Sequence, residues 1–320
     1  MEKLPSVSNE IDQDLINKIT LKNFNSISPY FYKLITEWMS GAYKQFKDID
    51  KFLILIYLIN TDFKFFRRNN IIITYDEFYK DKTLEISKTN LIEISKDLNI
   101  PKESVRRKIS QLERNGIIKK KGKKIFLDRT AYKFQEPVTT LKNLSNLISE
   151  FSEILTREEL LKKSLNRLEI SVLLKSNFSF CWYQFFKFIF SYCYRWRKYF
   201  KDLELMLIGI TIAFNSVTTA TVKLKGIESY IDKWRKEILQ SNERGINAMS
   251  ISDITGIPRP TVIRKIKILI KMNMIEIDKN KLLFVKFNEK SFNETSKLQN
   301  QTINDLSDFI SRTFNQININ

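Results

Sequence analysis

Basic side chains recur at helical spacing in the segment KESVRRKISQLERN, residues 102–115. When the apolar residues of this segment turn inward on one helix face, Arg106 and Arg107 project from the opposite face. A guanidinium group can bond the O6 and N7 atoms of guanine together, or clamp a phosphate. The chemistry predicted for this segment is therefore recognition of a polyanion.

The composition argues against catalysis. The chain has 320 residues, no histidine and only two cysteines, Cys181 and Cys193. This excludes Ser-His-Asp and Cys-His catalysis, HExxH zinc sites and cysteine-only zinc sites. Lys and Arg number 54 against 36 Asp and Glu, and the resulting net charge of +18 favours a nucleic acid or an anionic membrane surface as partner. We predict a protein that is not an enzyme and that needs no metal or cofactor.

The second half of the chain repeats the first. Three collinear blocks match: residues 31–58 with 185–212, residues 91–127 with 248–284, and residues 144–149 with 306–311. The shift is 154 positions in the first block and 157 in the second, a difference that one short loop change explains. We predict an internal duplication with halves at 1–160 and 161–320, each the size of one domain.

Each half is expected to contain the same elements in the same order. These are an aromatic-rich helix, an apolar helix, a pair of short helices, a hairpin and a final amphipathic helix. The predicted bounds are 30–46, 49–66, 90–115, 117–127 and 138–155 in the first half, and 178–200, 203–216, 247–273, 274–286 and 294–314 in the second. We also expect a strand at residues 71–75 and a helix at 226–241. The predicted fold class is mainly α with small β-hairpin wings.

The short-helix pairs are the most specific signal in the sequence. In the first pair, Ile100-Pro101 separates NLIEISKDLN from KESVRRKISQLERN, and proline is favourable at a helix start. In the second pair, Gly256 stands at the turn and Pro258 opens the following helix. A short helix, a tight turn and a second helix are typical of a helix-turn-helix. The lysine-rich turn 119–124 between two apolar stretches predicts a hairpin wing beside the first pair.

These segments resemble the winged helix-turn-helix regulators of the MarR and IclR type. Residues 94–118 follow the pattern of that family almost position by position, and the resemblance covers about 37 residues in each half. It implies two tandem winged-helix domains that bind double-stranded DNA, with each second helix in the major groove. Ordinary members pair so that two such recognition helices meet successive major grooves, ~34 Å apart.

The side chains expected to contact DNA lie on the two recognition helices and the two wings. They are Lys102, Ser104, Arg106, Arg107 and Ser110, then Lys121, Lys123 and Lys124, then Arg259, Thr261, Ile263, Arg264 and Lys267, and finally Lys279. Ile263 stands where the first copy has Arg106, so it suits a thymine methyl group rather than a phosphate. Because Ile268 and Ile270 make the second recognition helix apolar nearly all round, its partial burial against the protein is the competing interpretation.

The aromatic segment FSFCWYQFFKFIFSYCYRWRKYF, residues 178–200, allows three interpretations. It could stack on unpaired bases, lie on a membrane surface, or form core and the interface between the repeats. We favour the last, with Cys181 and Cys193 as buried packing residues. Whether the aromatic layer holds a small apolar effector stays open.

The apolar runs 52–59 and 205–214 are shorter than the roughly 20 residues of a membrane span, and no secretory signal is apparent, so we expect a cytoplasmic protein without a membrane partner. The predicted function is that of a sequence-specific transcriptional regulator that binds double-stranded DNA as an intramolecular pseudo-dimer. The chain would be a monomer with pseudo-two-fold symmetry or a homodimer. The alternatives are a plasmid-type replication initiator with tandem winged helices and a winged-helix protein-interaction module.

Overall fold

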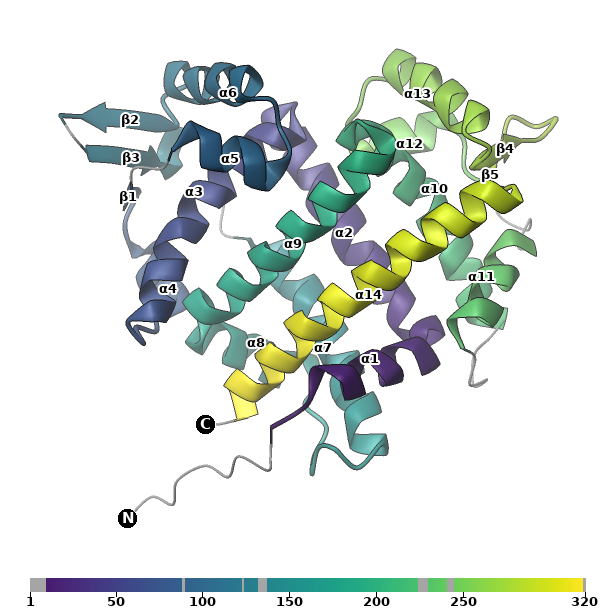
Figure 1. Cartoon of the computed structure of the whole chain (residues 1–320), viewed down its shortest axis with the longest axis horizontal. Coiled ribbons are helices and arrows are strands. Elements are labelled where there is room, and N and C mark those ends of the chain that lie inside the picture. The colour runs from purple at the N-terminus through teal and green to yellow at the C-terminus, as the bar shows by residue number, and fades with distance from the viewer. Residues whose placement is uncertain are drawn as a thin grey trace.

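A computed structural model describes residues 10–87, 90–122, 124–131, 137–223, 230–240 and 245–318 of the chain. Most of these residues are helical, and the strands form one three-stranded and one two-stranded antiparallel sheet. The predicted mainly α class with small hairpins is confirmed at this level. Figure 1 shows long helices crossing through the middle of the molecule and shorter helices and both sheets along one edge.

The described residues of the predicted first half form seven α-helices and three strands. They are α1 (Gln13–Lys22), α2 (Phe24–Phe46), α3 (Ile49–Arg68), α4 (Tyr75–Lys80), β1 (Thr83–Ile86), α5 (Leu91–Leu98), α6 (Lys102–Arg114), β2 (Ile118–Lys121), β3 (Lys124–Asp128) and α7 (Val138–Arg157). A short 3-10 turn, Arg129–Ala131, follows β3. Helix α3 has close to the predicted bounds of 49–66, whereas α2 ends at the predicted residue but begins at Phe24 rather than at residue 30.

The predicted second half follows the same order, except that its described residues contain no strand equivalent to β1. Its elements are α8 (Arg167–Ser176), α9 (Phe178–Phe200), α10 (Leu203–Lys223), α11 (Ile231–Gln240), α12 (Ala248–Thr255), α13 (Arg259–Lys271), β4 (Ile275–Ile277), β5 (Leu283–Val285) and α14 (Glu289–Asn318). The last helix begins earlier and ends later than the expected 294–314. Asn288 explains the early start, because its Oδ1 accepts a hydrogen bond from the Ser291 N–H at 2.9 Å.

Helices from the two halves interleave. The apolar helix α3 packs along α9, and its counterpart α10 packs along α2. The amphipathic helix α7 covers α2, α14 covers α9, and α1 lies on α14, as Figure 1 shows. The buried apolar residues of both halves belong to one continuous cluster. The boundary at residue 160 therefore stays a prediction about the sequence repeat, since the hydrophobic core extends across it.

The aromatic helix α9 lies in this core. Phe31 of α2 packs edge-on against Phe188 and Tyr192 of α9, with ring centroids 6.3 and 6.1 Å apart. Phe63 of α3 stacks on Phe186 at 6.1 Å. No aromatic side chain of α9 is exposed. The interpretation of α9 as part of the core is confirmed, because more than half of its rings are buried and the others are half-buried.

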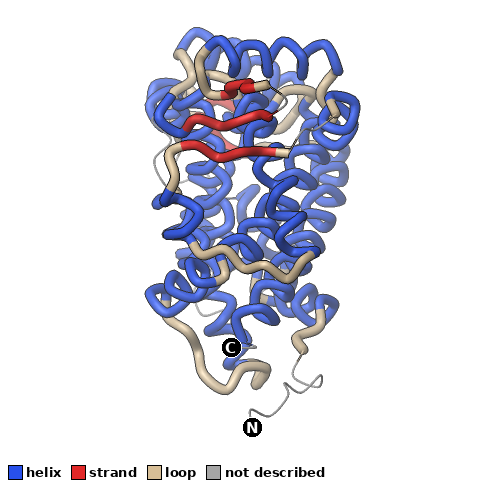
Figure 2. Tube along the Cα trace, turned by 90° about the vertical axis from the view of Figure 1, so that its left-hand side faces the viewer, coloured by secondary structure: helices blue, strands red, loops and turns tan. Residues whose placement is uncertain are grey.

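The three-stranded sheet has the order β1-β3-β2, with both pairs antiparallel. In the wing hairpin Ile118 pairs with Leu127 and Lys121 with Lys124, so the strands extend into the lysine run that we expected to be turn. Figure 2 shows this sheet face-on at the flank of the molecule. The second sheet is a two-stranded β4–β5 hairpin, joined by a single bridge between Ile246 and Leu283.

The prediction of a strand at residues 71–75 is wrong, because residues 71–74 are irregular and Tyr75 is helical. Thr74 and Glu77 form a capping box, in which the Glu77 N–H donates to Thr74 Oγ1 at 3.3 Å and the Thr74 N–H donates to Glu77 Oε2 at 2.8 Å. Tyr75 therefore begins helix α4, and the preceding residues are irregular. Ile73 instead attaches to the start of α9, where its N–H donates to Ser179 Oγ at 2.9 Å. The strand of this region is β1, which pairs with the wing.

The helix expected at 226–241 is present as α11, Ile231–Gln240; residues 226–229 and 241 lie outside the described residues. Within the described ranges, none of the helices combines the length and the hydropathy that crossing a bilayer requires.

Candidate nucleic-acid interface

Local hydrogen bonds build the first helix-turn-helix. Asn90 Oδ1 accepts a hydrogen bond from the Ile92 N–H at 2.9 Å and begins α5. Asn99 ends this helix in the left-handed conformation, at φ 52°, which asparagine adopts more readily than most residues. Across the turn, Ser95 Oγ donates to the carbonyl of Ile100 at 2.7 Å. The turn between α5 and α6 is therefore held by its own side chains.

The second helix-turn-helix uses the same devices at equivalent positions. Asn247 Oδ1 accepts from the Ser250 N–H at 2.9 Å and begins α12. Gly256 ends α12 at φ 73°, and Ser252 Oγ donates to the carbonyl of Ile257 at 2.7 Å. The two turns present α6 and α13 in the same way.

The predicted contact face of α6 is exposed. Lys102, Arg106 and Arg107 are exposed, whereas Ser104 and Ser110 are half-buried. Arg106 pairs with Glu103 one turn earlier, at 2.8 Å, and because both side chains are about 70% exposed this ion pair is weak and can yield to a phosphate. Arg107 makes no ion pair within the described residues. The inner face is formed by Val105 and Leu112, as expected.

The outer face of α13 is also exposed, which does not agree with the competing interpretation of partial burial. Arg259, Ile263, Arg264 and Lys267 are exposed and Thr261 is half-buried. Ile268 and Ile270, the two isoleucines on which the partial-burial interpretation was based, are 42% and 36% exposed. The reason is that Val262, Ile266 and Leu269 already form the buried face. Helix α13 thus offers a mixed basic and apolar surface.

The first wing is less free than its lysine count predicts. Three of its lysines make ion pairs: Lys119 with Asp128 at 2.5 Å, Lys120 with Glu113 at 2.6 Å and Lys124 with Glu85 at 2.9 Å. The Lys119 ammonium and the Thr130 hydroxyl hold the pKa of Asp128 at about 2. Lys121 is exposed, with its ammonium 5.8 Å from the centre of the Phe126 ring. Lys123 lies outside the described residues.

The second wing carries an exposed Lys279 in a turn shaped by Asp278. The Asp278 carboxylate accepts hydrogen bonds from the N–H groups of Asn280 and Leu282, at 2.9 and 2.8 Å. Asp278 therefore acts as a turn former. Lys286 pairs with Glu276 at 3.0 Å, which reduces the positive charge that this wing presents.

Two buried lysines, which the sequence pattern did not single out, attach α6 and α13 to the core. Lys108 of α6 is 9% exposed and forms ion pairs with Asp48 and with Asp50, the latter at 3.4 Å. Lys265 of α13 is 5% exposed and forms ion pairs with Asp202 and with Glu204, the latter at 3.3 Å. We call these two ion-pair groups the anchors. Their signal in the sequence was identity at equivalent positions of the two halves, Lys108 with Lys265 and Asp48 with Asp202.

The acidic residues of the anchors also begin the apolar helices. Asp48 Oδ1 accepts from the Asp50 N–H at 3.0 Å at the start of α3, and Asp202 Oδ1 accepts from the Glu204 N–H at 2.8 Å at the start of α10. Each anchor thus joins a recognition helix to the first turn of a core helix.

The anchors place α6 and α13 at the same edge of the molecule. Figure 1 shows both helices along the upper edge, with the β2–β3 wing at one outer end and the β4–β5 wing at the other. The short helices α5 and α12 lie next to them, on the side toward the core. Two exposed basic helices therefore occupy one edge, and the wings flank them.

Further lysines that sequence reasoning missed lie at the ends of α2 and α9 near this edge. All four of these lysines are exposed: Lys44 and Lys47 at the end of α2, and Lys198 and Lys201 at the end of α9. Lys44 corresponds to Lys198, and Lys47 to Lys201, at the shift of 154 positions. The Lys44 side chain lies at the second turn, so a Cβ added at Gly256 would approach its Cγ to 2.6 Å. Their sequence signal was the presence of lysine at both positions of each pair separated by 154 residues.

The cysteines do not contribute a nucleophile. Burial raises the pKa of both thiols, Cys181 and Cys193, to about 12. A thiolate is the reactive form, so neither side chain is activated at neutral pH.

Comparison of the chain with protein-family models, with curated proteins and with solved structures finds no match.

Proposed function

We propose that this chain is a sequence-specific double-stranded DNA-binding transcriptional regulator that acts by occupying its site, without covalent chemistry. The observation that carries the proposal is the placement of two exposed arginine-bearing helices, α6 and α13, at one edge of the molecule. An α-helix fits the major groove of DNA, and a wing at each outer end is in position for backbone contacts. The net charge of +18 supports a polyanionic partner.

We propose further that the chain is an internal duplication that binds as a pseudo-dimer of two winged helices. Helix bounds recur at the shifts found in the sequence: α1 and α2 recur as α8 and α9 after 154 positions, and α5 and α6 recur as α12 and α13 after 157. The anchors and the serine hydrogen bonds of the turns recur with them. Because Arg106 corresponds to Ile263, the preferred DNA site would consist of two unlike half-sites ~34 Å apart.

The test begins with selection of bound fragments from random duplex DNA, followed by affinity measurements on the selected site at two salt concentrations. Arg107→Ala should weaken binding to the selected site by roughly 1–3 kcal/mol and relax specificity at one base pair. Lys121→Ala should weaken binding to all sequences alike and reduce the salt dependence by about one phosphate. Arg167→Ala removes an exposed arginine at the start of α8, away from the edge, and serves as the matched control.

The proposal fails if no selected sequence emerges, or if Arg107→Ala and Arg167→Ala behave alike. A footprint that covers one symmetric half-site would contradict the pseudo-dimer. A replication initiator would instead bind direct repeats and melt the duplex locally, which permanganate reactivity of unpaired thymines detects.

The exposed isoleucines favour a second candidate function, a protein-interaction module. Ile263, Ile268 and Ile270 are each exposed by more than a third on the outer face of α13. An apolar helix face is a common protein-binding element. Affinity for DNA that is weak and insensitive to salt would support this candidate over the first.

A further inference from the structure

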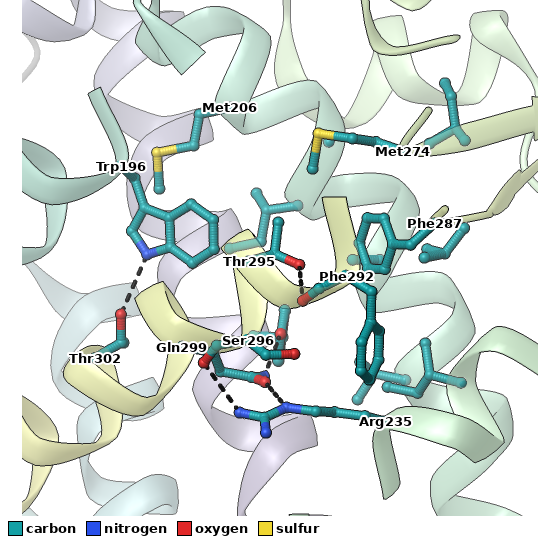
Figure 3. A pocket seen from close by; sticks show the side chains of 18 of the residues that line it. Trp196, Met206, Arg235, Met274, Phe287, Phe292, Thr295, Ser296, Gln299 and Thr302 are labelled. Atoms are coloured by element: carbon teal, nitrogen blue, oxygen red, sulfur yellow. Dashed lines mark hydrogen bonds between the residues drawn. The ribbon is translucent and has the colours of Figure 1, made fainter. Parts of the chain in front are cut away.

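A pocket lies beneath the second recognition helix. Its volume is about 120 Å³, and helices α10, α13 and α14 and the second wing contribute to its walls. Figure 3 shows Trp196, Met206, Met274 and Phe287 around it, with Arg235 on the side of Gln299 and Ser296. Its lining is mostly apolar, so the pocket is suited to an uncharged guest.

The pocket exists because α10 has small residues where α3 has large ones. At the shift of 154, Gly209, Ala213 and Val217 of the pocket wall correspond to Leu55, Ile59 and Phe63. Those three side chains are buried in the first half, at 0%, 6% and 1% exposure. The second half lacks their volume at the corresponding positions. A packed core normally leaves few voids larger than a water molecule, so an opening of this size marks a departure from ordinary packing.

One polar group of the pocket lacks a partner. Trp234 is 2% exposed, and its indole N–H finds no hydrogen-bond acceptor among the described residues. Burying such a donor without an acceptor costs roughly 1–3 kcal/mol. The Trp196 indole, by contrast, donates to Thr302 Oγ1 at 3.2 Å.

The charge in the pocket wall is already compensated. The guanidinium of Arg235 donates to Asp232 Oδ1 at 2.9 Å, to Gln299 Oε1 at 2.7 Å and to Asn300 Oδ1 at 2.6 Å. An anionic guest would have to displace one of these partners. A neutral guest leaves them in place and requires only an acceptor for Trp234.

We propose that this pocket binds a small neutral molecule, namely a single aromatic ring that carries one hydrogen-bond acceptor directed at the Trp234 N–H. The pocket volume of about 120 Å³ is of the same order as that of a dry apolar cavity of about 150 Å³ that binds benzene, so a single ring is the largest guest it suits. Occupancy stabilises the folded chain by RT ln(1 + c/Kd) at a free ligand concentration c, so the melting temperature should rise with the logarithm of the ligand concentration once that exceeds the dissociation constant.

The pocket is in direct contact with the reading surface. Leu269 of α13 lines it from above, and Met274 and Ile275 line it at the start of the wing. A guest therefore restrains α13 and the second wing but not α6, so its binding should change contacts with one DNA half-site. This coupling rests on the proposed function, whereas the binding site does not.

The binding test uses acetophenone, a ring with a carbonyl acceptor, and ethylbenzene, a ring of similar size without one. Calorimetry on the full chain without DNA should show saturable one-to-one binding of both, with acetophenone bound more tightly. Trp234→Phe should weaken acetophenone by about fivefold or more, the loss expected for one hydrogen bond, and leave ethylbenzene within about twofold.

Filling the pocket provides the second arm. Ala213→Ile restores the residue of the first half and should abolish binding of both probes. Gly209→Ala is the milder version, because its Cβ would lie 3.7 Å from Leu269 Cδ2 in ordinary contact, and it should weaken binding while raising the melting temperature. Ile59→Val, at the position equivalent to Ala213, is the control and should bind both probes as the parent does.

The binding site is refuted if neither probe binds up to its solubility, or if Ala213→Ile folds and binds both as before. Equal weakening of both probes by Trp234→Phe would refute the role of the indole. DNA affinity with and without acetophenone is measured separately. A bound probe with no effect on DNA refutes the coupling alone, and absent DNA binding refutes the proposed function while the calorimetric result stands.

Discussion

At the scale of single residues, two neighbouring acids at the start of α10 have different environments. Asp202 caps the helix and forms an ion pair with Lys265, and it is 40% exposed. Glu204 has its pKa raised, chiefly by burial and partly by the nearby carboxylate of Asp202, although Lys265 lowers it. Proximity to a lysine therefore does not ensure that a carboxylate stabilises the fold, because loss of solvation opposes the attraction.

The Glu204 environment predicts a pH dependence. Because the pKa is higher in the folded chain than the model-peptide value of 4.5, its contribution to stability is present at low pH and is lost as the pH rises through the folded pKa. Glu204→Gln should therefore gain stability relative to the parent between pH 4 and pH 7. Urea unfolding of both proteins at the two pH values measures this, and a difference that is constant or of opposite sign would contradict it.

At the scale of elements, the two anchors are alike in position but unequal in charge. In the first, Asp50 also forms an ion pair with Arg197 of α9, which links the two halves. The position equivalent to Arg197 in the first half is occupied by Tyr43, which carries no charge. In the second anchor, therefore, no arginine from this position pairs with Glu204, and Lys265 supplies the positive charge. The first anchor keeps a compensating cation when its lysine is removed.

The inequality predicts that Lys265→Met costs more stability than Lys108→Met. Removing one partner of a buried ion pair leaves an uncompensated charge, and for partly exposed carboxylates we expect about 1–3 kcal/mol for Lys265→Met. Arg197 should limit the loss in Lys108→Met. Free energies of unfolding at pH 7 test the order, and a double variant with Glu204→Gln should recover part of the loss. A larger cost at Lys108 would show that Arg197 does not compensate.

Elements were predictable where the signal is local. Apolar residues every three to four positions predicted the helices on both sides of each turn. The first helix of each pair ends at Asn99 or Gly256, residue types that tolerate a positive φ. The strand expected at residues 71–75 failed because a run of isoleucines fits either state, and the deciding signal was the Thr74–Glu77 spacing of a capping box. The exposure of α13 depended on which apolar face was already occupied.

At the scale of the whole molecule, the halves exchange their main packing partners. The apolar helix of each half packs along the aromatic helix of the other, α3 on α9 and α10 on α2. Separating the halves would expose both faces at once. A large exposed apolar surface is unfavourable in water, so each separated half would either associate with another chain or unfold.

The exchange predicts that residues 1–160 and 161–320, produced separately, do not form folded monomers. Each should be unfolded, aggregated or self-associated, and mixing during co-expression should restore a one-to-one complex with cooperative unfolding. Circular dichroism and gel filtration with light scattering distinguish these outcomes. A folded monomer of either half with a cooperative transition would show that the exchanged contacts are dispensable.

By itself, the sequence determined roughly where most helices lie and that Arg106, Arg107 and Arg264 face outward on α6 and α13, because those properties follow from a local period of 3.6 residues. Only the tertiary structure decided that α6 and α13 share one edge, that Lys108 and Lys265 are buried, and that most described lysines of the first wing are paired. An apolar face specifies that a segment is buried but not which partner covers it. The pocket under α13 likewise arises only when Gly209 and Ala213 meet the surrounding helices in three dimensions.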